Sequence, residues 1–147
     1  MEHNSHLQIK PKSKTGIYHQ ITTKSAQWEY LNFEARLMYQ GETWEHDTQG
    51  NEMVIVLLSG NFKVESNHGN WETKNGRKDV FSGVAHTLYL SRNSKFTLTA
   101  LSDSLDIGYG WCKVEEDFPA KFVTPEDTPV VIFGGDNATR QFNDLVP

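Results

Sequence analysis

The run Glu52–Gly60, with the sequence EMVIVLLSG, is apolar at every position from Met53 to Leu58. Successive side chains of a strand point to opposite faces, so a strand of this kind is covered on both sides. In a single small domain the inner layer is an opposing sheet. The outer layer then has to come from a long terminal segment or from a second copy of the chain. Gly60 allows a tight turn into a returning strand over Asn61–Glu65.

The rest of the chain repeats with a period of two rather than 3.6 residues. In the run 32–39, apolar Phe33, Ala35 and Leu37 alternate with polar neighbours, which is typical of a half-buried strand. The runs 95–101 and 130–133 are also rich in β-branched and aromatic residues. Clusters of turn residues separate these runs, and no long stretch carries a helical stripe. The pattern predicts an all-β sandwich or barrel in one domain.

Composition limits the partners that the chain can have. The sequence has 147 residues, with 14 Lys and Arg against 19 Asp and Glu, for a net charge of −5. A net acidic chain without a basic cluster argues against nucleic acid or a membrane surface as a partner. The first residues lack the apolar core of a signal peptide, and the single Cys112 suits a reducing compartment. We therefore expect a cytoplasmic location.

Two spaced blocks surround the apolar strand. The first runs from Gly41 to Gly60 and contains His46, and the second runs from Asp79 to Leu90 and contains His86. Together they resemble the two blocks of the cupin superfamily, which implies a jelly-roll β-barrel. In metal-binding cupins the first block supplies two His one residue apart and a Glu, and the second block supplies one more His.

The resemblance assigns only part of that ligand set to this chain. His46 and His86 match, whereas Thr48 stands at the second His and Met53 stands at the Glu. Glu52 is one residue out of phase and should point to the opposite face. Because a stable site needs three or four donors, we expect weak or no metal binding, with His46 and His86 near one another at the barrel mouth. The alternative is a loop histidine and a pocket-lining histidine without a metal.

A narrower family is indicated by the runs 21–42 and 133–147 together with the apolar strand. They resemble the first half of the 5-deoxyglucuronate isomerase family, which groups with 4-deoxy-L-threo-5-hexosulose-uronate ketol-isomerase. The most specific parts are Trp28-Glu-Tyr30 and the Gly-Asp-Asn-Ala-Thr-Arg run at 135–140. The resemblance implies a protein of two barrels, of nearly twice this length, whose divalent metal (zinc or manganese) is bound in the second barrel.

The same resemblance sets the expected domain organisation. We expect residues 1–15 to be a loosely ordered segment and residues 16–147 to be a cupin domain that resembles the first barrel of such an isomerase. Within it, the barrel itself should extend over residues 17–133.

The resemblance implies an aldose–ketose isomerisation of a deoxy uronic acid. A substrate carboxylate favours an Arg partner, for which Arg140 is the candidate, although Arg140 could instead pair with Asp136 or Asp144. Aromatic residues line sugar pockets but also fill cores; those considered are Trp28, Tyr30, Trp44, Trp71, Tyr89, Tyr109 and Trp111. The candidate substrate-binding set is His46, His86, Tyr89 and Arg140.

Two other functions stay open on the sequence alone. One is a non-catalytic single cupin that binds a small sugar or acid without a metal. The other is a structural barrel that forms a homodimer or a higher homo-oligomer through the outer face of its apolar strand.

Overall fold

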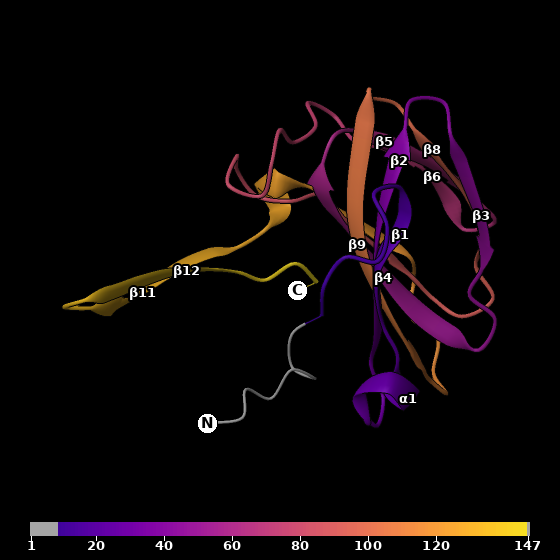
Figure 1. The fold of residues 1–147 in the computed structure, drawn as a ribbon, viewed down its shortest axis with the longest axis horizontal. Coiled ribbons are helices and arrows are strands. Elements are labelled where there is room, and N and C mark those ends of the chain that lie inside the picture. Colours follow the sequence, from indigo (N-terminus) through magenta and orange to yellow (C-terminus); the bar gives the residue numbers. More distant parts are fainter. Residues whose placement is uncertain (1–8, 147) are drawn as a thin grey trace.

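The computed structural model describes residues 9–146 and builds them almost entirely from antiparallel β-strands (Figure 1). A six-stranded sheet in the order β1-β2-β9-β4-β7-β10 packs against a four-stranded sheet in the order β3-β8-β5-β6. The strands of the first sheet are β1 (Gly16–Ile21), β2 (Asn32–Tyr39), β9 (Ser104–Lys113), β4 (Asn51–Ser59), β7 (Thr87–Leu90) and β10 (Lys121–Val123). Those of the second are β3 (Thr43–Asp47), β8 (Lys95–Ala100), β5 (Phe62–Ser66) and β6 (Gly69–Glu72). The helices described are α1 (Thr23–Ala26) and the 3-10 turn η2 (Pro125–Asp127), so the all-β prediction is confirmed.

Strand β4 lies between β9 and β7 and carries the apolar run. Its inner-face residues Met53, Ile55 and Leu57 are at most 2% exposed. Burying a side chain of this size contributes about 1.5–3 kcal/mol to folding. Val56 and Leu58 face outward and are half-buried. The prediction of a strand is therefore confirmed, and its inner face contributes more to the core than its outer face.

The chain changes sheets at Gly60. This residue has a φ of +91°, and a Cβ placed there would overlap the carbonyl oxygen of Ser104. Its backbone pairs with Arg77 in an isolated bridge. Strand β5 then pairs with β6 and β8 in the opposite sheet, so the expected return of residues 61–65 alongside β4 is wrong. The tight conformation at Gly60 directs the chain across the sandwich instead of back along β4.

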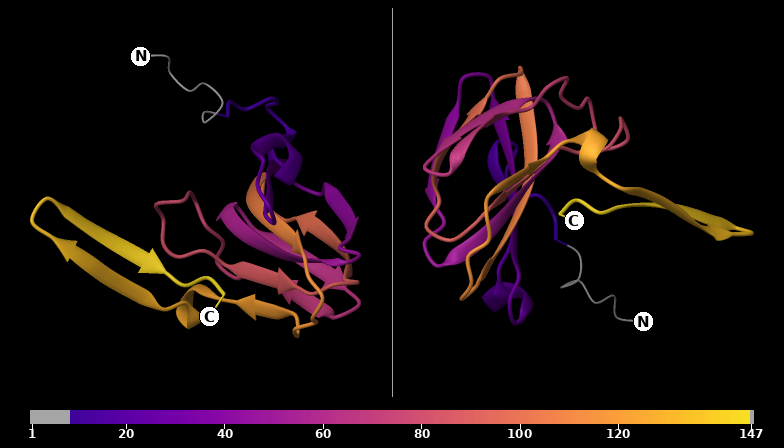
Figure 2. Two further views of the ribbon diagram at one scale, coloured as in Figure 1. Left: turned by 90° about the horizontal axis from the view of Figure 1, so that it is seen from below. Right: turned by 180° about the vertical axis from the view of Figure 1, so that it is seen from behind.

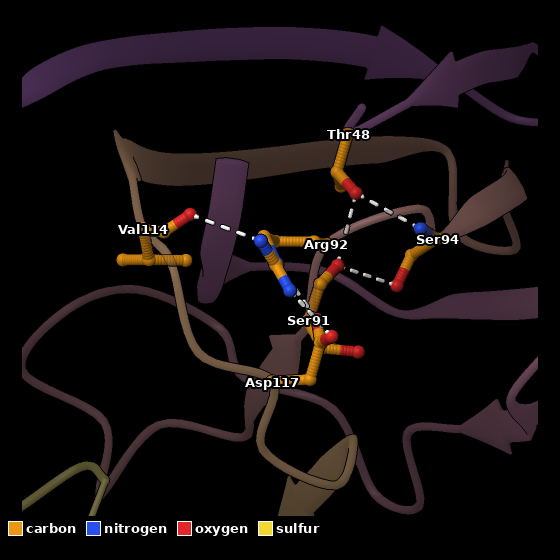
Figure 3. Close-up of polar contacts among 6 residues, drawn as sticks. All are labelled: Thr48, Ser91, Arg92, Ser94, Val114 and Asp117. Carbon is orange, nitrogen blue, oxygen red and sulfur yellow. Dashed lines mark hydrogen bonds and ion pairs between the residues drawn. The ribbon is translucent and has the colours of Figure 1, made fainter. Parts of the chain in front are cut away.

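A polar network joins the end of β3 to the turn between β7 and β8 (Figure 3). The Thr48 hydroxyl donates to the carbonyl of Ser91 at 2.9 Å and accepts from the backbone N–H of Ser94 at 2.9 Å. Beside it, Arg92 forms an ion pair of 2.6 Å with Asp117. Thr48 is 1% exposed. Its hydroxyl is therefore a structural crosslink between the two sheets.

Strands β11 (Val130–Gly135) and β12 (Ala138–Asn143) form a separate two-stranded sheet. This hairpin, which we call the arm, projects away from the barrel in all three views (Figures 1 and 2). The prediction that the barrel extends to residue 133 is wrong, because β10 is the last strand that joins its sheets. Beyond β10, Pro125 opens η2 and the next strand pairs only within the hairpin.

The structure describes only part of the N-terminal segment 1–15, which we expect to be loosely ordered. Residues 1–8 lie outside the described residues, and residues 9–15 are exposed without helix or strand before β1 begins at Gly16. Over the described part of the chain, neither helix has the length or the apolar character needed to cross a bilayer.

Candidate ligand-binding site

A cavity of about 380 Å³ opens between β2 and β9 of the large sheet and β3 of the small sheet. We call it the β2–β3 cavity. It is lined by Ile17, Glu34, Arg36, Trp44, His46, Asp47, Thr48, Gln49, Asn51, Met53, Tyr109 and Trp111. Its volume falls at the lower end of the range of small-molecule sites, about 300–1,000 Å³.

Charged residues of β2 point into this cavity. Glu34 lies directly opposite Tyr109 in the pairing of β2 with β9. The Tyr109 hydroxyl donates to Glu34, and Nε of Arg36 donates to the Tyr109 hydroxyl at 3.4 Å. Burial raises the pKa of Tyr109, and its bond to Glu34 acts in the same direction. Tyr109 therefore stays protonated at neutral pH and holds the Glu34 carboxylate in place.

Aromatic rings form one wall of the cavity. The guanidinium carbon of Arg36 lies 4.7 Å from the centroid of the Trp44 ring. The Trp44 and Tyr109 rings are 4.6 Å apart, and Tyr109 stacks on Trp111 at 6.1 Å. Trp44 and Tyr109 are buried and Trp111 is half-buried, so Trp111 is the ring of this group that can pack against the C–H groups of a sugar.

His46 also lines the cavity. Its ring lies 5.3 Å from Trp44 and 5.7 Å from Phe96. Burial lowers the pKa of His46 below its ordinary value of 6.5, against the opposing effect of Asp47 and Glu34. The imidazole is therefore neutral at pH 7 and can accept a hydrogen bond or a proton.

His86 has different surroundings from His46. It is 4% exposed, and its ring stacks on Phe122 of β10 at 5.7 Å. Its Nδ1 is buried without a hydrogen-bond partner in the described part of the chain, and burial lowers the pKa of the ring. His86 does not line the β2–β3 cavity. The two imidazoles therefore have different ring neighbours, and only His46 lines this cavity.

The donors of this barrel do not fit a metal ion. Met53 lines the cavity, whereas Glu52 lies on the opposite face, where it accepts from the Tyr89 hydroxyl at 2.9 Å. The Sγ of Cys112 lies 3.4 Å from the other oxygen of Glu52. Within residues 9–146, no three His, Cys, Asp or Glu side chains form a group that could hold a metal. Glu52 and Met53 thus point to opposite faces of β4, as strand alternation predicts.

Two further candidates lie away from the cavity. Tyr89 is on the outer face of the large sheet with Glu52, and burial raises the pKa of its hydroxyl. Arg140 is in the arm, paired across the hairpin with Phe133. It forms no ion pair among residues 9–146, so the alternative pairing with Asp136 or Asp144 is not formed.

Glu34 and Arg36 are not among the candidate residues that the sequence pattern indicates. The alternation in β2 suggested that the apolar set faced the core, but the structure turns the polar set inward. The available signal was the pair of glycines in β9, Gly108 and Gly110, which gives the apolar residues of β2 a place on the outer face.

A family model described as KduI/IolB family matches residues 6–147. The chain belongs to the KduI/IolB family. A relative from Geobacillus thermodenitrificans, named 5-deoxy-glucuronate isomerase, is 29% identical over 128 residues, which cover 86% of this chain and 46% of the relative. A relative of the same name from Bacillus subtilis is 24% identical and is covered over 55% of its length. The resemblance to this isomerase family is therefore confirmed, and the chain spans about half the length of the curated relatives it matches.

Solved structures with a similar fold identify the architecture of this chain. An IolB-like protein from Salmonella typhimurium matches with a TM-score of 0.88 at 21% identity, over 95% of this chain and 53% of that protein. The cupin domain of Schizosaccharomyces pombe Cnp3 matches with a TM-score of 0.53 at 14% identity, over 72% of this chain and 68% of that one. These matches confirm the cupin jelly roll.

Proposed function

We propose that this chain is the first barrel of a sugar-acid isomerase of myo-inositol catabolism. The reaction is the conversion of 5-deoxy-glucuronate to 5-dehydro-2-deoxy-gluconate, an aldose–ketose isomerisation. The observation that carries the proposal is the family match over residues 6–147, together with relatives named 5-deoxy-glucuronate isomerase. A cytoplasmic location accords with the free thiol of Cys112.

The described residues of this chain provide groups that can position a substrate but no cluster of metal donors. Isomerisation moves a hydrogen between adjacent carbons and needs a base together with polarisation of the carbonyl oxygen. A divalent metal such as zinc or manganese supplies that polarisation in a ligand-complete barrel. Here the neutral imidazole of His46 and the Arg36 guanidinium can position a sugar acid, but the donors for a metal are not gathered. We therefore expect this barrel to need a second barrel for turnover.

The test is an isomerase assay with 5-deoxy-glucuronate in the presence of zinc or manganese. The chain alone should show no turnover, and turnover should appear when the half of the Geobacillus relative that this chain does not match is added in trans. That half alone and this chain alone are the controls. Turnover by this chain alone that is lost in a His86→Ala variant would contradict the assignment of the metal to the other barrel. No gain over the added half alone would contradict a role for this barrel in the reaction.

A second candidate function is assembly, and the arm favours it. Five large apolar side chains of the arm are 50–60% exposed: Val130, Val131, Ile132, Phe133 and Phe142. An isolated two-stranded hairpin is only marginally stable in water. Cross-strand pairing gives Val131, Phe133 and Phe142 a common face. This face therefore needs a covering partner.

We propose a second copy of this chain as that partner. The arm continues into the outer face of β4, because Val56, Phe142 and Leu145 line one groove. A two-fold arrangement would let each arm cover the other copy's β4 face. The matched relatives are about twice as long as this chain.

Sedimentation velocity at tens of micromolar tests this assembly. The chain should sediment as a dimer, and Phe133→Asp should convert it to a monomer. Phe81→Asp is the matched control, because Phe81 is 94% exposed outside the arm and its substitution should leave the dimer intact. A monomeric parent chain, or a dimer that survives Phe133→Asp, would rule out the arm as the interface.

A further inference from the structure

The guanidinium of Arg36 lines the β2–β3 cavity and forms no ion pair among residues 9–146. Its Nε makes a long hydrogen bond of 3.4 Å to Tyr109, and its two terminal nitrogens make no hydrogen bond or ion pair in this part of the chain. A guanidinium presents its donors as a planar fork that matches the two oxygens of a carboxylate. Arg36 therefore has an open recognition edge.

The neighbouring acid does not fill that edge. One oxygen of Glu34 accepts from the Gln20 side chain at 2.7 Å, and the other accepts from the Tyr109 hydroxyl. No ion pair joins Glu34 to Arg36, although both project from β2 into the cavity. Two neutral donors thus hold the carboxylate of Glu34 and leave the Arg36 charge for a ligand.

The second acid of the cavity is also engaged elsewhere. An oxygen of Asp47 accepts from the backbone N–H of Gln49 at 2.9 Å, and the carboxylate lies 3.9 Å from the ammonium of Lys95. The acid therefore has partners at the rim, on the side of β8. The remaining titratable group, His46, is neutral at pH 7 because burial lowers its pKa. Both acids of the cavity therefore have hydrogen-bond donors of their own, whereas the terminal nitrogens of Arg36 are left for a ligand.

The aromatic residues beside Arg36 indicate which chemical group of a ligand would lie next to its carboxylate. Trp44 lies under the Arg36 guanidinium, and Tyr109 and Trp111 continue the aromatic surface. Trp44 and Tyr109 are 8% and 2% exposed, whereas Trp111 is half-buried. A sugar ring can therefore lay its C–H face on Trp111 while its hydroxyls reach His46 and Asn51, which line the same cavity. A cation at one end of an aromatic wall matches a sugar acid better than a neutral sugar.

We propose that the β2–β3 cavity is a metal-independent binding site for sugar acids, in which Arg36 takes the carboxylate in a bidentate contact. The choice of a sugar acid rather than another small carboxylate rests on the proposed function. The site belongs to this barrel alone, so it works without the second barrel and without turnover.

Isothermal titration in buffer with EDTA tests the site, with D-glucuronate as the probe and D-glucose as its neutral counterpart. Glucuronate should bind about tenfold or more tightly than glucose, because a charge-assisted pair is lost with the neutral sugar. Arg36→Gln should remove this preference, and Arg36→Lys should keep part of it. Arg140→Gln is the matched control, and it should leave the preference unchanged because Arg140 lies in the arm.

The outcomes separate this inference from the proposed function. Equal affinity for the two sugars, or a preference that survives Arg36→Gln, overturns the site. If Arg36→Gln fails to fold, Arg36→Lys decides, because an unchanged preference in that variant would show that the fork is not used. Turnover by the two-half assembly without a glucuronate preference in this chain would overturn the site and leave the isomerase proposal. A glucuronate preference in this chain, without any turnover by the two-half assembly, would support the site and overturn the isomerase proposal.

Discussion

The guanidinium of Arg36 lies over the indole of Trp44, with 4.7 Å between the guanidinium carbon and the ring centroid. The contact joins β2 of the large sheet to β3 of the small sheet across the cavity. It fixes a flexible cationic side chain against a rigid ring, which lowers the entropy cost of presenting the fork to a ligand.

Replacing Trp44 by Phe should weaken this support. A cation–π contact contributes about 0.5–1 kcal/mol at a partly exposed site, and Trp is the best partner. We expect glucuronate affinity to fall by about two- to fivefold, measured by titration. Trp28→Phe is the control, since Trp28 is 47% exposed and does not line the cavity. An equal loss in both variants would argue against the contact.

Tyr109→Phe should destabilise the barrel. It removes the hydroxyl that donates to Glu34, and a hydrogen bond to a charged group contributes about 1.5–3 kcal/mol where it is buried. We expect a loss of about 1–2 kcal/mol in the free energy of unfolding by urea, because Glu34 keeps the bond from Gln20. Tyr30→Phe removes a similar bond to Glu29 at an exposed position and should have almost no effect. Similar losses in the two variants would mean that burial of the Tyr109 bond does not matter.

The two faces of β4 should differ in their contribution to stability. Leu57→Ala deletes a side chain with 0% exposure and should cost about 2–5 kcal/mol. Leu58→Ala, on the half-buried outer face, should cost about 1 kcal/mol in a monomeric background such as Phe133→Asp. Urea unfolding of both variants in that background measures the difference. Equal costs would show that the outer face is covered within a single chain.

Acid should destabilise the fold through His86. Burial lowers the pKa of His86, with Glu126 opposing the shift, so the unfolded chain binds the proton more readily than the folded chain. The stability is fully present above the unfolded pKa of about 6.5 and is lost as pH falls through the lower folded pKa. His46 acts in the same direction.

The melting temperature should therefore fall between about pH 7.5 and pH 5. His86→Phe, which keeps a ring against Phe122, should make this fall smaller. His68→Phe is the control, because His68 is exposed in the turn after β5 and should leave the fall unchanged. A profile that is as steep in His86→Phe as in the parent would exclude His86 as a source of the acid sensitivity.

Much of the fold could be predicted from the sequence because β-strand alternation is local information. The run 32–39 coincides with β2, and the apolar run 52–60 coincides with β4 apart from single residues at its ends. The pairing of strands depends on contacts between distant residues, so the crossing at Gly60 and the separation of the arm were not accessible to a local pattern.

The site was harder to predict because alternation gives two faces without saying which one is inside. Glu34 and Arg36 looked like solvent-facing residues of a half-buried strand. They face the interior because Gly108 and Gly110 leave room on the outer face, where Phe33 and Leu31 pack against them. The Glu34 carboxylate is satisfied on the buried side by Tyr109 and on the exposed side by Gln20.

A crystal structure of the chain soaked with D-glucuronate in metal-free buffer tests the central claim most directly. The account predicts a sugar acid in the β2–β3 cavity, with both carboxylate oxygens on the terminal nitrogens of Arg36 and the sugar ring against Trp111. A glucuronate bound at Arg140, or an empty cavity at a concentration that saturates binding in solution, would contradict it.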